Sequence, residues 1–319
     1  MITVAGAGVA GLACAYELAR AGAQVTVFEA SAATGDAAAS WWAGGMLAPW
    51  CEGETADPEV VRLGTGAIDW WAGITPVTRR GTLVLTPPRD RSELDRFARR
   101  TQRHQWLNGA EIAQLEPALQ GRFQRGLFFR DEAHLNPRRA LADLAAAARA
   151  SGVEIRYGTP APDRVDVDCR GMAAELTGLR AVRGEMAVID APGVEITRTL
   201  RLLHPRIPLY LVPRGNGRFM IGATMVESAA RHPVTLRSML ELLGAAFALH
   251  PALAEASVIE TGVGLRPAFA DNLPRLTRVG ATYHLNGLYR HGFLLAPALA
   301  GQLARTMSKE TVDEDPGQC

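Results

Sequence analysis

A glycine-rich segment near the N-terminus has the residue types and spacing that bind a pyrophosphate. Gly6, Gly8 and Gly11 form the pattern Gly-x-Gly-x-x-Gly, after a short apolar run and before apolar residues at helical spacing. In a strand, turn and helix, Gly6 makes the turn, Gly8 lets the backbone approach the pyrophosphate, and Gly11 lets the helix lie close to the sheet. Val9 and Ala10 then open the helix, whose positive end faces the phosphates. The pattern predicts a dinucleotide site.

An acidic residue follows at the distance that such a unit requires. Residues 24–30 alternate like a second strand and end on Glu29 and Ala30, roughly 20 residues after the last glycine. Glu29 is expected to accept hydrogen bonds from the adenosine ribose, and its charge would repel the 2′-phosphate of NADP. The alternative is a tight turn in an unrelated α/β domain. The pattern also does not separate FAD from NAD, because both contain adenosine diphosphate.

A second glycine-containing segment has no helical or alternating period. Residues 40–49 are uncharged and contain the pair Gly44 and Gly45, which favours a loop that the backbone of a ligand or neighbour can approach closely. The alternative is a buried loop that packs Trp41 and Trp42.

The rest of the chain alternates between predicted helices and short strands. Helices are expected from Pro58 to about Trp71 and over 92–104, 137–150, 236–249 and 292–307, the last with a glycine-flanked start. Strands are expected over 81–86, 153–157, 165–169, 183–191, 210–213, 218–223, 257–265 and 282–286.

The strands around the turn at Asn216 and Gly217 predict an antiparallel sheet, which cannot belong to a parallel nucleotide domain. The expected class is therefore α/β: a Rossmann-like domain interrupted by an α+β domain with an antiparallel sheet. We assign residues 1–75, 134–178 and 258–319 to the cofactor domain, and residues 76–133 and 179–257 to the substrate domain.

The length and charge of the chain limit the kinds of partner that it can bind. The chain has 319 residues, enough for about two domains. Its 34 Lys and Arg residues nearly balance 33 Asp and Glu residues, which argues against a nucleic-acid or membrane-surface partner and favours a small molecule. The uncharged stretch 1–16 lacks the basic start of a signal peptide, and no other uncharged run reaches the roughly 20 residues of a membrane helix. We expect a cytoplasmic protein.

Cysteine and histidine spacing gives no support to a metal site. Cys14, Cys51, Cys169 and Cys319 are far apart in the sequence, and the seven histidines form no His-x-x-x-His pair. Cys14 falls in the first predicted helix, where a reduced, packed side chain is expected.

The chain resembles the D-amino-acid oxidase superfamily, and within it the FAD-dependent glycine oxidases of thiamine biosynthesis (ThiO type). The resemblance rests on AGGMLAP at 43–49, YLVPR at 210–214 with RFMIGATM at 218–225, GVGLRP at 262–267 and LYRHGFLLAP at 288–297. Together with the first 30 residues, these segments are collinear with the family over essentially the whole chain.

The resemblance implies non-covalently bound FAD with its isoalloxazine ring between the two domains. The family's flavin-contacting segments match Gly44, Gly45 and Met46 in one loop, and Leu288, Tyr289, Arg290, His291, Gly292, Phe293 and Leu294 near the pyrimidine end of the ring. Ser40 is a further cofactor-binding candidate. The start of the final helix would supply partial positive charge there. Ala161 matches an adenine-side contact, although the segment 158–168 is shorter than in many glycine oxidases.

Three residues match the family's catalytic positions. Arg266 corresponds to the anchor of the substrate carboxylate, a role that suits a planar guanidinium that keeps its charge when partly buried. Its alternative is an ion pair within its own domain. Tyr210 corresponds to a pocket tyrosine, and its alternative is an ordinary strand residue. Arg290 corresponds to an arginine beside the flavin. Glu185 is a family feature and Arg170 a departure from the family; neither receives a role.

The implied reaction is oxidation of glycine by O2 to glyoxylate, ammonia and hydrogen peroxide, for the thiazole branch of thiamine biosynthesis. A D-amino-acid oxidase or a sarcosine-type amine oxidase is the alternative within the class. An inert FAD-binding module and an NAD-dependent dehydrogenase are the rivals outside it. The family also implies a homo-oligomer, and the chain marks no interface.

Overall fold

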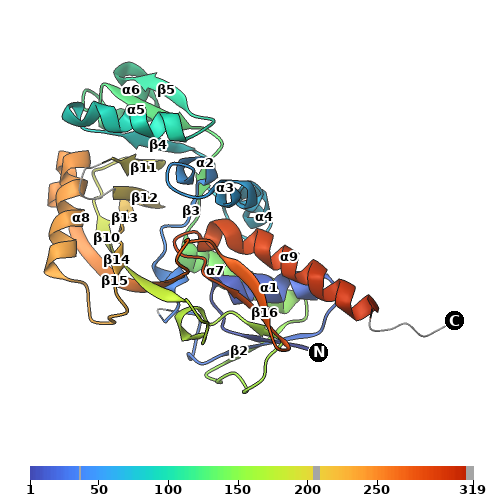
Figure 1. Ribbon diagram of the computed structural model, residues 1–319. Helices are drawn as coiled ribbons and strands as arrows, with labels where there is room; N and C mark the ends of the chain where they lie inside the picture. The colour runs from blue at the N-terminus through green and yellow to red at the C-terminus, as the bar shows by residue number, and fades with distance from the viewer. Residues whose placement is uncertain (36, 204–208, 314–319) are drawn as a thin grey trace.

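The computed structural model describes residues 1–35, 37–203 and 209–313, and its strands form two large sheets (Figure 1). The first sheet has six strands. In spatial order they are β16 (Arg275–Val279), β17 (Thr282–Asn286), β9 (Val167–Asp168), β1 (Ile2–Ala5), β2 (Val25–Glu29) and β8 (Glu154–Tyr157). All neighbours are parallel except β16 and β17. Strand β9 lies between β1 and β17 and thus joins strands from the two ends of the chain into one layer.

The helices that cover this sheet are amphipathic or apolar. Helix α1 (Val9–Arg20) packs against α7 (Pro137–Ala150) and α9 (Gly292–Asp313), and Figure 1 shows α1 beside α9. Their shared core includes Leu12, Leu18 and Leu303, which are fully or almost fully buried. The side chain of Asn136 accepts hydrogen bonds from two N–H groups of the first turn of α7, as expected of an N-cap.

The second sheet has nine strands and belongs to the other domain. In spatial order they are β14 (Val226–Glu227), β10 (Arg180–Asp190), β13 (Arg218–Gly222), β12 (Leu209–Gly215), β11 (Thr199–Leu202), β4 (Thr82–Leu85), β6 (Arg125–Phe129) and β5 (Gln105–Asn108), with β15 (Ser257–Ala268) paired along β10. The pairs are antiparallel except β4 with β11.

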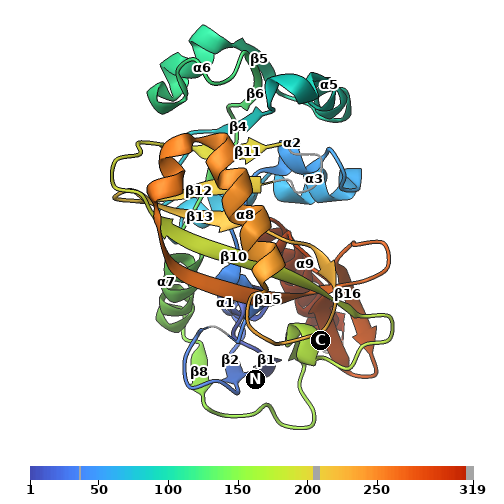
Figure 2. The same ribbon diagram turned by 90° about the vertical axis from the view of Figure 1, so that its left-hand side faces the viewer.

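One face of this second sheet packs on α8 (Leu236–Leu249), which Figure 2 shows lying across β10, β12 and β13. Leu242 and Leu249 of the helix share a buried core with Leu211 and Ile221 of the strands. The opposite face of the sheet is therefore left for the first domain and its ligand.

Two expectations about element boundaries differ from the structure. Strand β15 pairs with β10, so residues 258–268 belong to the second sheet and the sheet boundary falls after Ala268. The alternating pattern alone could not tell which sheet this strand joins. The helix expected from Pro58 to Trp71 is two helices, α3 (Pro58–Gly64) and α4 (Ala67–Ala72), because Gly66 interrupts it.

The remaining elements lie between or outside the two sheets. They are β3 (Met46–Leu47), which pairs with β7 (Ala133–His134), and helices α2 (Pro49–Glu52), α5 (Arg91–Arg100) and α6 (Gly109–Leu115). Short 3-10 turns include η1 (Ala39–Trp42) and η4 (Gly171–Ala173). Within the described ranges, no helix combines the length and apolar character of a bilayer span. Cys14, Cys51 and Cys169 are buried and form no disulfide bond.

Candidate functional site

The glycine turn after β1 has no room for side chains at two of its positions. Gly6 has a φ of +95°, and a Cβ atom there would lie 3.0 Å from the carbonyl oxygen of Cys169. A Cβ atom on Gly11 would lie 1.8 Å from the carbonyl oxygen of Gly6. At Gly8 a Cβ atom would meet nothing nearer than Ser40 Oγ at 3.7 Å. The first and third glycines therefore let the backbone fold tightly.

Two polar side chains fix this turn. Glu29 Oε2 accepts a hydrogen bond from the N–H of Ala7 at 2.8 Å, and its Oε1 accepts from the N–H of Ser31 at 2.9 Å. Each carboxylate oxygen keeps a lone pair for a ligand hydroxyl. Ser40 Oγ accepts from the N–H of Val9 at 3.3 Å, at the start of α1. The other N–H groups of this first turn have no carbonyl within the helix, as an anion site requires.

Arg214 holds the loop that contains Gly44 and Gly45 through hydrogen bonds to backbone carbonyls. Gly45 has a φ of +73°, and a Cβ atom there would lie 2.3 Å from the carbonyl oxygen of Leu135. Arg214 donates to the carbonyls of Gly44 at 2.9 Å and Leu135 at 3.3 Å. Burial lowers the pKa of Arg214 to about 10, so the guanidinium stays charged at neutral pH. Sequence reasoning gave Arg214 no role.

The segment before α9 is tied to the end of β15. The N–H of Tyr289, whose φ is +49°, donates to the carbonyl of Pro267 at 2.8 Å. The N–H of His291 donates to the carbonyl of Leu288 at 2.8 Å, and α9 begins at Gly292. These bonds place the helix N-terminus beside Arg266 and its strand.

A cavity of about 620 Å³ connects these segments. Its volume is within the range of ligand pockets in proteins, which is roughly 300–1,000 Å³. The predicted residues that line it are Gly6, Gly8, Val9, Ala10, Glu29, Ala30, Ser40, Gly44, Gly45, Met46, Ala161, Tyr210, Arg266, Leu288, Tyr289, Arg290, His291, Gly292, Phe293 and Leu294. Gly11 does not line it, because it faces the Gly6 carbonyl.

At the other end of the cavity, two side chains lie over glycine residues of the second sheet, where no side chain blocks them. The guanidinium of Arg266 lies over Gly184, where a Cβ atom would be 2.2 Å from Nη2. Its Nη1 donates to the carbonyl of Thr224 at 2.9 Å. The ring of Tyr210 lies over Gly222, where a Cβ atom would be 2.8 Å from the hydroxyl oxygen. Burial raises the pKa of Tyr210, so its hydroxyl is protonated.

A buried acidic residue, Glu52, stands beside Arg290. Glu52 Oε2 lies 2.8 Å from Arg290 Nη2 and 3.5 Å from His291 Nδ1, and Oε1 lies 3.4 Å from Arg201 Nη1. Burial alone would raise the pKa of Glu52, but the charges around it, that of Arg290 first, lower it to about 2. Burial lowers the pKa of His291 to about 4, so this ring is neutral at pH 7.

Glu52 and Arg201 line the cavity and were missed by sequence reasoning. Glu52 ends α2, three residues beyond the glycine loop, and Arg201 belongs to a short strand rich in leucine. No local motif marks either residue. A charged residue in an otherwise apolar strand was the one signal that could have indicated Arg201.

Arg170, which received no role from the sequence, pairs with a buried carboxylate. Arg170 Nη2 lies 2.7 Å from Asp168 Oδ2, and its Nε lies 3.1 Å from Oδ1. The pair flanks the glycine turn, because the Cα of Arg170 would be 3.3 Å from a Cβ on Gly6. Arg170 also lines the cavity.

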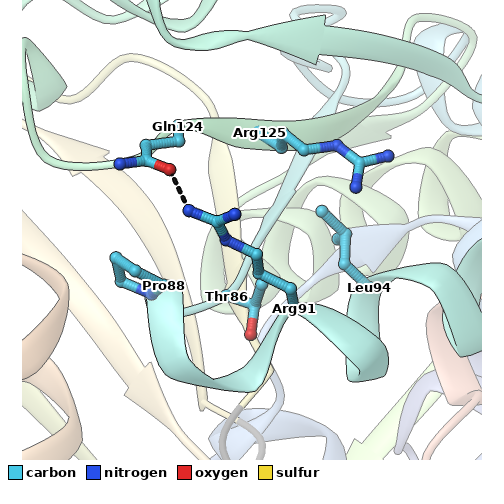
Figure 3. Close-up of a pocket in the computed structure, with 6 residues that line it drawn as sticks. All are labelled: Thr86, Pro88, Arg91, Leu94, Gln124 and Arg125. Carbon is cyan, nitrogen blue, oxygen red and sulfur yellow. Dashed lines mark hydrogen bonds between the residues drawn. The ribbon is translucent and has the colours of Figure 1, made fainter.

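A second hollow lies on the surface of the other domain and is much smaller. It is lined by Thr86, Pro88, Arg91, Leu94, Gln124 and Arg125, and Arg91 donates a hydrogen bond to Gln124 across it (Figure 3). Its volume of about 10 Å³ holds no more than a water molecule. The large cavity is therefore the candidate active site.

The structure supports a dinucleotide of FAD size in the large cavity. One end has the glycine turn, the helix N-terminus and Glu29, and the other has the glycine loop and the start of α9. The buried Nε of Arg290 has no hydrogen-bond partner among the described residues, so a polar ligand atom is expected beside it.

Comparisons with known proteins agree with this geometry. The family model "DAO: FAD dependent oxidoreductase" matches residues 1–306. The chain is 55% identical to a putative thiamine biosynthesis oxidoreductase ThiO of Rhizobium etli, over 97% of both chains. It is 26% identical to a glycine oxidase of Bacillus licheniformis, over 94% of this chain and 91% of the relative.

The crystal structure of an iminodiacetate oxidase from Chelativorans sp. BNC1 has the same fold, with a TM-score of 0.78 and 26% identity. The match covers 97% of this chain and 95% of the other. The chain belongs to the DAO family of FAD-dependent oxidoreductases, in its ThiO group, and its cofactor is FAD.

Proposed function

We propose that this enzyme oxidises glycine to its imine, which is hydrolysed to glyoxylate and ammonia or passes to thiazole formation in thiamine biosynthesis. The names of the ThiO and glycine oxidase relatives support the proposal. The observation that carries it is the guanidinium of Arg266, which faces the cavity without forming an ion pair with any described residue. A half-buried cation without an ion pair favours an anion beside it, and the carboxylate of an amino acid supplies one.

The residues proposed to hold FAD divide into three groups. Gly6, Gly8, Val9 and Ala10 would face the pyrophosphate, and Glu29 and Ala30 the adenosine, with Ala161 beside it. Gly44, Gly45 and Met46 would contact the ring system, as would the segment from Leu288 to Leu294, whereas Ser40 lies at the start of α1 beside the pyrophosphate residues. Gly11 would act through helix packing, since it does not reach the cavity.

The substrate residues act by position. Arg266 would bind the carboxylate of glycine through two parallel hydrogen bonds, and the protonated hydroxyl of Tyr210 would donate a further one. Arg290 is fixed by Glu52 at 2.8 Å, so it adds positive charge without occupying the carboxylate site. A small amino acid held in this way presents its α-carbon in one orientation, and positioning supplies much of the catalysis.

The overall reaction converts glycine, O2 and water into glyoxylate, ammonia and hydrogen peroxide. FAD, when bound, accepts two electrons from the α-carbon and amine and passes them to O2. When the substrate amine is neutral, the oxidation needs no protein side chain to act as a base. Since Glu52 has a pKa of about 2, it is a weak base and is assigned an electrostatic role.

A spectrum of the purified protein, taken before and after anaerobic addition of substrate, tests the proposal. Flavin bands that bleach with glycine support it. Bands that bleach with D-alanine or sarcosine but survive glycine would replace it with a D-amino-acid oxidase or a sarcosine-type oxidase. Denaturation is expected to release FAD into the supernatant, because the attachment is proposed to be non-covalent.

The proposal also includes a cytoplasmic location and a homo-oligomer. Buried, unbonded Cys14, Cys51 and Cys169 support a reducing compartment. Light scattering measures the oligomeric state directly, and a monomeric mass would remove that part of the proposal.

A further inference from the structure

A row of residues crosses the second sheet on the face that bears the cavity. Arg201 of β11 pairs with Tyr210 of β12, Tyr210 pairs with Gly222 of β13, and Gly222 pairs with Met186 of β10. Directly paired residues of neighbouring strands project from the same face. Arg201 therefore projects beside Tyr210, the residue proposed to bind the substrate carboxylate.

Arg266 reaches the same face from the other side of the row. Its guanidinium lies over Gly184, which is two residues from Met186 on β10 and so on the same face. Three strand spacings, roughly 14 Å, separate β10 from β11. Both arginines line the cavity. Arg201 and Arg266 therefore reach one cavity from strands on either side of Tyr210.

The positive charge at this end exceeds the negative charge. Of the described residues that line the cavity here, Arg201, Arg266 and Arg290 are cationic and Glu52 is anionic; Arg231 also lines the cavity. Neutral His291 adds no charge at pH 7. Three guanidiniums and one carboxylate leave two positive charges in excess. The single carboxylate of glycine balances one of them.

Of the two arginines that share Glu52, Arg201 has the longer contact. Glu52 lies 2.8 Å from Arg290 but 3.4 Å from Arg201. The guanidinium of Arg201 also lies 5.2 Å from the centre of the Phe97 ring, which attracts a cation more weakly than a carboxylate does. Only 11% of the Arg201 side chain is exposed. Burying a cation is costly unless an anion accompanies it.

The other acidic groups near Arg201 have partners of their own. Glu54 lies 3.5 Å from Arg100 and 4.0 Å from Arg96. Glu132 accepts a hydrogen bond from the N–H of Cys51 at 2.7 Å, and burial raises its pKa to about 7, so it carries only part of a charge. Neither carboxylate forms an ion pair with Arg201 among the described residues.

We propose that Arg201 is a second anion-binding residue of the substrate cavity, and that it selects amino acids with a second carboxylate on the amine nitrogen. The inference rests on the proposed function, because it takes Arg266 as the anchor of the first carboxylate. The simplest such substrate is iminodiacetate. One C–N bond is oxidised, O2 accepts the two electrons, and water cleaves the imine. Iminodiacetate, O2 and water give glyoxylate, glycine and hydrogen peroxide.

Binding of ligands that cannot be oxidised tests this without turnover. Diglycolate and methoxyacetate differ in the second carboxylate, and each perturbs the flavin spectrum of the holoenzyme when it binds. We expect diglycolate to bind at least about tenfold more tightly than methoxyacetate. In Arg201→Gln this ratio should fall to about twofold or less, and Arg201→Lys, which keeps the charge, should retain part of it.

Two further variants sharpen the binding test. Glu52→Gln removes the competing carboxylate, so the ratio should rise above that of the wild type. Arg91→Gln is the matched control, because Arg91 lies in the small surface hollow of Figure 3, and its ratio should equal that of the wild type. If Arg201→Gln does not fold, Arg201→Lys and Glu52→Gln still decide the outcome. Equal ratios in the wild type and in all Arg201 and Glu52 variants would overturn the proposal.

Turnover separates this inference from the proposed function. The readout is kcat/KM for iminodiacetate divided by kcat/KM for glycine, in which general damage to the site cancels. A ratio above one that drops about tenfold in Arg201→Gln supports the subsite. Glycine oxidation with no Arg201-dependent ratio and no preference for diglycolate overturns the subsite and leaves the proposed function intact. Failure to oxidise any amine would contradict the proposed function. The diglycolate titration would then still test whether Arg201 binds an anion.

Discussion

Gly184 makes room for the guanidinium of Arg266. A Cβ atom at position 184 would lie 2.2 Å from Arg266 Nη2 and 2.3 Å from Cζ, inside the contact distance of any two atoms. Because the two residues belong to paired strands β10 and β15, the absence of a side chain on one strand fixes the position of the charged group from the other. The position of the proposed substrate anchor therefore depends on a glycine of the neighbouring strand.

Gly184→Ala should raise the KM for glycine about tenfold or more, since the guanidinium must move aside. Arg266→Ala should raise it further, because a carboxylate without its partner costs roughly 3–5 kcal/mol. Gly193→Ala is the control, as a Cβ atom there meets nothing within 4 Å. Steady-state kinetics measures all three. An unchanged KM in Gly184→Ala would mean that Arg266 is not the anchor.

Tyr210→Phe should raise the KM for glycine by roughly ten- to hundredfold, which corresponds to the loss of one hydrogen bond to a charged group, about 1.5–3 kcal/mol. The ring should stay in place, because it packs against Gly44 and Gly222. Tyr16→Phe, far away on α1, is the matched control. If both variants leave KM unchanged, the hydroxyl of Tyr210 does not touch the substrate.

The catalytic efficiency for glycine should rise with pH below the pKa of the substrate amine, since the neutral amine is the reactive form. Burial raises the pKa of Tyr210, so this hydroxyl remains a donor over the same range and causes no opposing loss. Measurement of kcat/KM from pH 6 to 10 tests the prediction. A profile that falls with pH would show that the protonated amine reacts.

The free energy of unfolding of Glu132→Gln should increase, relative to that of the wild type, as the pH rises. Burial raises the pKa of Glu132 to about 7 from its ordinary value of 4.5. The wild type is therefore most stable below pH 4.5 and loses this stability as the pH rises through 7, by at most about 1.4 kcal/mol per unit. Gln has no proton to lose and can still accept from the N–H of Cys51. Urea unfolding of both proteins at pH 5, 6, 7 and 8 measures the difference, and parallel curves would contradict it.

Trp71→Phe should cost about 1–3 kcal/mol of stability by leaving a carbonyl unpaired inside α9. Pro297 has no N–H, so it cannot donate to the carbonyl of Phe293 four residues earlier, and Trp71 Nε1 donates there instead at 2.7 Å. In a Pro297→Ala background the helix supplies its own donor, and the same Trp71 substitution should cost less. A double-mutant cycle measures this coupling, and additive costs would contradict the account.

Local chemistry in the sequence was enough to predict the cofactor end of the site. The strand, glycine turn, helix and terminal acid follow one another within about thirty residues, and each residue type has a backbone reason to be there. The same holds for the Asn136 cap of α7 and for the start of α9. The predicted cofactor residues line one cavity, with Gly11 the exception, because its need for glycine comes from the contact between helix and turn.

At the substrate end, the resemblance indicated Arg266, Tyr210 and Arg290, and only the tertiary structure showed which other residues meet them. Arg201 and Glu52 reach the cavity because of strand register and the packing of a short helix after the loop, and neither is marked by a sequence pattern. No sequence pattern indicates that Gly184 and Gly222 lie under the side chains of Arg266 and Tyr210, or which sheet β15 joins. The physical reason is that periodicity reports which residues of one strand share a face, whereas the pairing of distant strands sets which charges meet.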